Sequence, residues 1–61
     1  MKISELRKLL VRSGCYLYRS GGKHDIWYSP KTGKYFPVPR HVSQEAGTGL
    51  TGSILKAAGI R

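Results

Sequence analysis

A single cysteine, Cys15, is the feature that most limits how this chain of 61 residues can fold. A domain this small buries only about 60% of the surface that its unfolded chain exposes, and many such domains need disulfides or a metal. One cysteine excludes an intrachain disulfide, and one cysteine with two histidines is too few for a closed tetrahedral metal site. We therefore predict one domain over residues 1–61, held by hydrophobic packing, with Cys15 as a small buried residue and with no metal or cofactor.

The charge balance predicts a polyanionic partner. Eleven Lys and Arg residues against three acidic residues give a net charge of +8. A positive field of this density attracts nucleic acid or an anionic membrane surface. The basic residues are spread from Lys2 to Arg61 instead of gathering on one amphipathic helix, which favours nucleic acid over a membrane. A basic surface that only maintains solubility is the remaining alternative.

The expected location is the cytoplasm. The segment Met1–Glu5 holds no apolar run long enough for a signal peptide, and no run of about 18 apolar residues could span a membrane. A lone thiol also suits a reducing compartment.

The first element is predicted to be a helix over residues 5–13. Ser4 can cap its N-terminus through the side-chain hydroxyl, and Gly14 can end it. Three leucines spaced three and four residues apart form one apolar stripe: Leu6, Leu9 and Leu10.

The middle of the chain is typical of β-structure. Strands are expected over residues 15–19, 24–29 and 34–38, and turns over residues 20–22 and 30–33. Pro37 and Pro39 cannot donate ladder hydrogen bonds, so the third strand should lie at an edge of the sheet or be broken at these prolines.

A second helix is predicted over residues 49–58, after an irregular connection over residues 40–47, and Gly59 should end it. The order α-β-β-β-α predicts an α+β fold in which both helices cover one face of a three-stranded antiparallel sheet, the arrangement of double-stranded-RNA-binding domains. If Ile26 faces the helices, alternation turns Trp27 toward solvent. The expected core comprises Ile3, Leu6, Leu9, Leu10, Leu17, Ile26, Val38, Leu50, Ile54 and Leu55.

His24 is the leading candidate for a catalytic residue. Histidine can both accept and donate a proton near neutral pH, and RNA cleavage by its own 2′-hydroxyl requires both steps. Lys23 and Arg19 could hold a phosphate from the two sides of the hairpin, and Gly22 lets an RNA backbone approach closely. An exposed histidine and ordinary surface charges are the alternatives at these positions. His41, in a polar loop, is a candidate auxiliary group.

The aromatic residues are a second set of candidate RNA-binding residues. Their rings could stack on bases, although most are expected to be packing or interface residues. These residues are Tyr16, Tyr18, Trp27, Tyr28, Tyr35 and Phe36. With only three acidic residues, Glu5, Asp25 and Glu45, two-metal nuclease chemistry is disfavoured.

Several short motifs in a fixed order resemble a known family. A Ser-Glu-Leu opening leads into a Leu-rich helix, and Leu17, Arg19, Gly22 and His24 are similar to a stretch that ends in Gly-Ser-His. Val38-Pro39-Arg40-His41 is similar to Val-Pro-x-His, and residues 52–60 are similar to a C-terminal Ser-Ile-Leu-Lys-x-Ala-Gly-Ile. These motifs resemble the HicA toxins of HicA–HicB toxin–antitoxin pairs.

The resemblance implies a type II toxin, a metal-independent endoribonuclease that cleaves mRNA and is neutralised by a HicB antitoxin. The catalytic histidine of the family corresponds to His24. Two positions depart from the family pattern: Lys23 stands where serine is usual, and Asp25 stands where a second histidine is common. Alternation places Asp25 on the strand face opposite to His24, so it is a poor candidate to orient the imidazole.

Three functional hypotheses follow from the sequence. The first is the RNA endonuclease, with His24 as general acid/base. The second is a non-catalytic RNA-binding module of the same fold, in which His24 is incidental. The third is a protein-interaction subunit whose charge recruits only an acidic partner.

Overall fold

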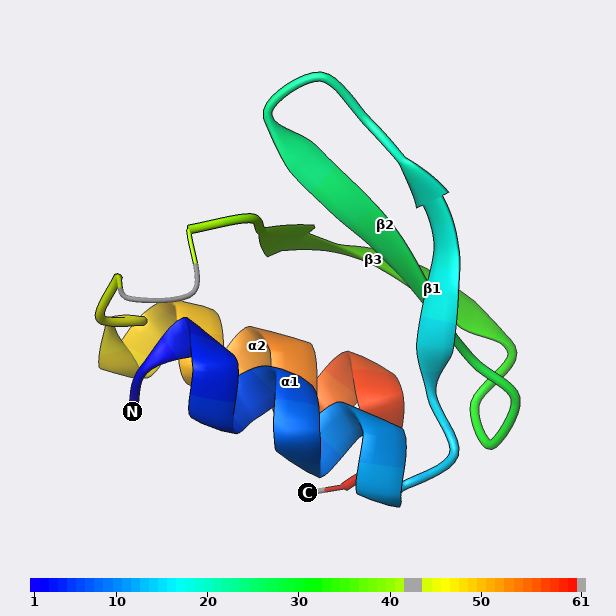
Figure 1. Cartoon of the computed structure of the whole chain (residues 1–61). Coiled ribbons are helices and arrows are strands. Elements are labelled where there is room, and N and C mark those ends of the chain that lie inside the picture. Colours follow the sequence, from blue (N-terminus) through cyan, green and yellow to red (C-terminus); the bar gives the residue numbers. More distant parts are fainter. Residues whose placement is uncertain (42–43, 61) are drawn as a thin grey trace.

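The computed structural model describes residues 1–41 and 44–60, and its elements follow the predicted order. They are α1 (Ile3–Arg12), β1 (Tyr16–Ser20), β2 (His24–Ser29), β3 (Lys34–Pro39) and α2 (Thr48–Ala58). The strands form an antiparallel sheet in the order β1-β2-β3. Both helices lie side by side on one side of this sheet (Figure 1). The predicted α+β fold, similar to a double-stranded-RNA-binding domain, is therefore confirmed.

Helix α1 begins two residues earlier than predicted, and Ser4 is not its N-cap. The cap is Lys2, whose backbone N–H donates to the Glu5 carboxylate over 3.4 Å. The N–H of Ile3 donates to the carbonyl of Gln44 at 2.9 Å, and the Ile3 side chain is fully buried. The segment before α2 thus satisfies one of the free backbone donors at the start of α1. Gly14, at φ +89°, follows the helix end as expected.

The strand with two prolines, β3, lies at an edge of the sheet, where residues without a backbone N–H are best tolerated. β3 is an edge strand, so Pro37 and Pro39 leave no central ladder bond unmade, as predicted. β1 is the other edge, and its register with β2 shifts between Leu17 and Arg19. This irregularity sets two residues, Tyr18 and Arg19, against Ile26 alone.

The prediction that Ile26 faces the helices and Trp27 faces solvent is wrong. Trp27 is 4% exposed and lies on the inner face, the side of the sheet that the helices cover, whereas Ile26 is only half-buried on the other side. Trp27 pairs with the buried Phe36 across the β2–β3 ladder, and the Arg7 guanidinium lies over its ring. An indole ring has a larger apolar area than isoleucine and gains more from burial, which favours this orientation of the strand.

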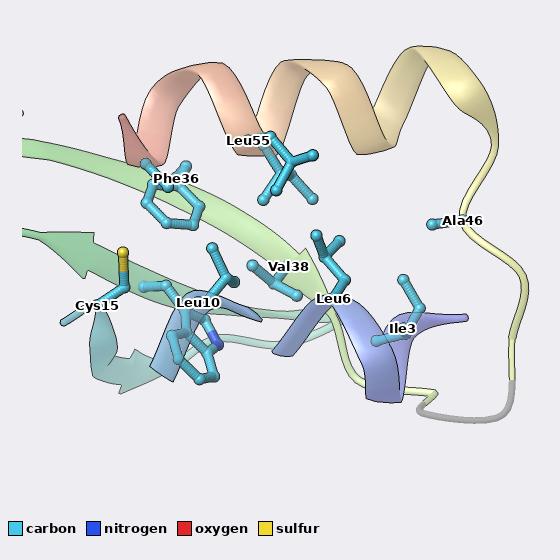
Figure 2. Packing of buried hydrophobic residues seen from close by; sticks show 11 residues of the cluster. Ile3, Leu6, Leu10, Cys15, Phe36, Val38, Ala46 and Leu55 are labelled. Carbon is cyan, nitrogen blue, oxygen red and sulfur yellow. The ribbon is translucent and has the colours of Figure 1, made fainter. Parts of the chain in front are cut away.

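The core lies between the inner face and the two helices (Figure 2). Most of the predicted core residues are buried, and Leu9 is partly buried against them. Cys15 is buried, as expected. The buried apolar set comprises Ile3, Leu6, Leu10, Cys15, Trp27, Phe36, Val38, Ala46, Ile54, Leu55 and Ala58.

Two leucines that were predicted to be in the core are exposed instead. Leu17 is 44% exposed because β1 is the sheet edge farther from α2, which packs mainly on β3. Leu50 is 40% exposed in the first turn of α2, because Ala46 and Ile3 fill the interior at that end of the helix (Figure 2).

The C-terminal end of α2 is held against the sheet by polar contacts. The buried Ser29 hydroxyl donates to the Ala58 carbonyl at 2.8 Å, which satisfies one of the orphan carbonyls of the last turn. Gly59, at φ +80°, ends the helix as predicted. In the described residues, neither helix has the length and apolar character needed to cross a membrane.

Candidate active site at the start of strand β2

The β2–β3 hairpin brings the two histidines of the chain into one cleft. Its antiparallel register sets His24, the first residue of β2, opposite Pro39, the last residue of β3. The chain that leaves β3 therefore passes His24 as it continues to His41. A cleft of about 610 Å³ opens at this point, and it is lined by Gly22, Lys23, His24, Pro39, Arg40, His41 and Gln44.

The turn before β2 depends on Gly21. Its N–H donates to the His24 carbonyl at 2.9 Å, which closes the hairpin directly behind the catalytic candidate. A Cβ atom at position 21 would lie 2.4 Å from that carbonyl oxygen, so only glycine fits without displacing the strand. A Cβ atom at Gly22 would meet no atom within 4 Å. Packing thus requires glycine at position 21, whereas Gly22 leaves open space beside the cleft.

We expect Gly21→Ala to destabilise the domain and to disturb the position of His24. The contact with the His24 carbonyl should cost about 1–3 kcal/mol of the free energy of unfolding, as overpacking usually does. The matched control is Gly22→Ala, which should change stability by less than about 0.5 kcal/mol. Denaturant unfolding of both variants measures the difference. Equal stability of the two variants would contradict the steric role of Gly21.

An ion pair between Arg40 and Asp25 holds the backbone beside the cleft in place. Asp25 is 8% exposed on the inner face, and the Arg40 Nε donates to its Oδ1 at 2.9 Å. An Arg40 Nη2 also donates to the Gly21 carbonyl, so one guanidinium ties β2, β3 and the turn together. Asp25 lies opposite to His24, as predicted, and its carboxylate is engaged elsewhere. Sequence reasoning gave Arg40 no role, although its place beside His41 in the Val-Pro-Arg-His motif was a signal.

The predicted site residues divide into two groups. His24, Lys23, Gly22 and His41 line the cleft together, and all four are exposed to solvent. Arg19 lies outside this set, on β1 opposite Ile26. The two imidazoles are groups that can exchange protons, and Lys23 adds a positive charge beside them.

Among the described residues, no acidic side chain lines this cleft. Asp25 pairs with Arg40, Glu45 with the N-terminal amino group, and Glu5 accepts from the backbone of Lys2. Among residues 1–41 and 44–60, no three His, Cys, Asp or Glu side chains gather as a metal site would require.

A protein-family model covers nearly the whole chain. The model of the family described as "HicA toxin of bacterial toxin-antitoxin" matches residues 3–60, which include every residue that lines the cleft. The chain belongs to the HicA toxin family. The resemblance inferred from its motifs is therefore confirmed. No curated protein and no solved structure matches the chain.

Membership of the HicA family identifies the biological class of the protein. HicA toxins are one half of bacterial toxin–antitoxin systems, so this chain has the role of a toxin and the family implies an antitoxin as its partner.

Proposed function

We propose that this toxin is an endoribonuclease that cleaves mRNA in the cytoplasm and so arrests translation and growth. The observation that carries the proposal is the cleft at the start of β2, where His24, His41 and Lys23 meet in a chain of net charge +8. Its positive charge attracts the RNA backbone, and its imidazoles supply the proton transfers.

His24 acts first as the general base. It takes the proton from a ribose 2′-hydroxyl, and the 2′-oxygen then attacks the adjacent phosphorus atom. The bond from phosphorus to the 5′-oxygen of the next nucleotide breaks, and that oxygen leaves with a proton from an acid. The products are a 2′,3′-cyclic phosphate end and a 5′-hydroxyl end. His41 is our candidate for the acid because it lines the same cleft.

The phosphate is held by basic groups of the cleft. The Lys23 ammonium would bind a non-bridging phosphate oxygen and oppose the negative charge that grows on it during attack. Open space at Gly22 lets the RNA backbone approach this turn. The guanidinium of Arg40 is held by Asp25 and by the Gly21 carbonyl, so it fixes the turn that carries Lys23.

The reaction needs no metal in this proposal. A two-metal mechanism needs clustered carboxylates, whereas the three acidic side chains are separated and each has a partner of its own. Proton transfer by imidazole supplies an alternative route to the same products.

A HicB antitoxin is the proposed inhibitor. A protein with an acidic surface would be drawn rapidly to a toxin with eleven basic residues, and burial of the cleft would exclude RNA. Such a complex would also stabilise a domain with a small core.

The proposal is tested with purified toxin and a labelled RNA in the presence of EDTA. We expect cleavage to continue, the products to carry 2′,3′-cyclic phosphates, and an RNA with 2′-O-methyl groups throughout to remain intact. Loss of cleavage in EDTA would overturn the metal-free mechanism. Binding of both RNAs without any product would instead favour a non-catalytic RNA-binding module of the same fold.

A further inference from the structure

Four tyrosines gather on the outer face, the side of the sheet turned away from the helices. The ring centroids of Tyr18 and Tyr35 lie 4.8 Å apart, those of Tyr28 and Tyr35 lie 4.7 Å apart, and those of Tyr16 and Tyr28 lie 5.6 Å apart. The rings therefore form one continuous group that crosses all three strands. We call these four residues the tyrosine cluster.

The tyrosine cluster is exposed. Tyr16, Tyr18 and Tyr35 are each between 51% and 56% exposed, and Tyr28 is half-buried among them. Figure 1 shows the helices on the other side of the sheet, and in the described part of the chain neither helix covers the outer face. Large aromatic rings left in water on one face usually mark a binding surface.

The charges on the outer face suit an anion. The register places Arg19 on this face, opposite Ile26. All three acidic side chains lie elsewhere, since Asp25 is on the inner face, Glu5 is on α1 and Glu45 pairs with the N-terminus. Partial desolvation and, after it, the neighbouring phenols raise the pKa of Tyr35 above its ordinary value. A phenol of ordinary pKa is already neutral at neutral pH, so Tyr35 adds no negative charge to the surface.

The outer face leads to the cleft. Alternation along β2 puts His24, Ile26 and Tyr28 on the same side, because the residues that alternate with them, Asp25, Trp27 and Ser29, are buried on the other side. Four residues of an extended strand separate His24 from Tyr28 by about 13 Å. A short run of nucleotides could thus lie across the tyrosine cluster and still reach His24.

We propose that the tyrosine cluster is a stacking platform for the bases of single-stranded RNA and that it guides the strand into the cleft at His24. The proposal deepens the proposed function and rests on it, because it names the form of RNA that is cut. Bases of a duplex are already stacked and paired, so they cannot lie on these rings. Stacking on tyrosine accepts any base, whereas Arg19 would contact a phosphate of the same strand.

The test is a binding titration with the unaltered chain and two double variants. The ligand is a short single-stranded RNA with 2′-O-methyl groups throughout, which lacks the hydroxyl needed for cleavage, so the result does not depend on catalysis. Tyr18→Leu with Tyr35→Leu keeps apolar bulk but removes two rings, and we expect at least a tenfold rise in Kd, on the order of one stacked base. The matched control, Tyr18→Phe with Tyr35→Phe, keeps both rings and should bind nearly as well as the parent.

Three outcomes would overturn the platform. The first is an unchanged Kd of the leucine variant for the single strand, with its thermal unfolding showing an intact fold. The second is an equal loss of affinity for a duplex RNA of the same length, which would indicate a general effect on charge or fold. The third is unchanged RNA binding together with weaker binding of the antitoxin, which would assign the tyrosine cluster to a protein partner. Failure of the EDTA experiment with intact binding here would instead reject only the catalytic proposal.

Discussion

Replacement of His24 by alanine is expected to slow RNA cleavage by about 10²–10⁴-fold, the usual contribution of a general acid or base. His24 is exposed at the first position of β2, and its backbone carbonyl, not its imidazole, holds the Gly21 turn. Alanine keeps that backbone bond, so the fold and the affinity for RNA should be retained. The measurement is the single-turnover rate of cleavage at saturating enzyme, with thermal unfolding of both proteins.

Two further variants test whether the loss of activity is specific to His24. Lys56→Ala, on the exposed side of α2, removes a basic side chain away from the cleft and should cleave at the parental rate. His41→Ala should slow cleavage if His41 supplies the proton to the leaving oxygen. A folded His24→Ala protein that cleaves as fast as the parent would exclude His24 as the catalyst. The cleft would then need another proton acceptor.

Leu6→Ala is expected to remove most of the stability of the domain. Leu6, on α1, is fully buried in the core between the helices and the sheet. Replacing a buried leucine by alanine usually lowers the free energy of unfolding by about 2–5 kcal/mol. A chain of 61 residues has a free energy of unfolding on the order of 3–9 kcal/mol, at roughly 0.05–0.15 kcal/mol per residue. The loss is large on this scale because no disulfide constrains the unfolded chain.

The control for this prediction is Leu50→Ala. Leu50 is 40% exposed, so its truncation should cost less than about 1 kcal/mol. Urea unfolding followed by circular dichroism measures both variants. Similar losses for the two leucines would show that the packing around Leu6 is less complete than its burial indicates. Rescue of Leu6→Ala by an added antitoxin would be expected from mass action on the folded state.

Local patterns in the sequence were sufficient to predict the elements. The leucine stripe, the glycines at helix ends and the prolines of the last strand each act within a few residues, so they predicted two helices and three strands with errors of one or two residues. The sequence also identified His24 as the candidate catalytic residue, because it follows a glycine-containing turn and matches the family motif. The pairing of His24 with Pro39 could also have been predicted, because a hairpin that closes at Ser29 and Lys34, around the turn at 30–33, sets these two residues opposite each other.

The errors arose where two faces of one element competed for burial. The apolar alternation of β2 fits either Ile26 or Trp27 toward the helices, and only the packed interior, with Phe36 opposite Trp27, decides between them. Leu17 has the side chain of a core residue, but its strand lies at the edge of the sheet. The start of α1 depended on a bond from Ile3 to Gln44, which is distant in the sequence.

The sequence by itself thus determined the order of the elements, the excess of positive charge and the identity of the candidate base, since these depend on composition and on neighbouring residues. Only the tertiary structure decided which side of the sheet is buried, how Arg40 joins Asp25 and the Gly21 turn, and that four tyrosines share one face with His24. The physical reason is that burial and pairing across strands are set by all the elements together. A local pattern determines which side chains of a segment are able to form a buried face, and packing against the other elements determines which of them are buried.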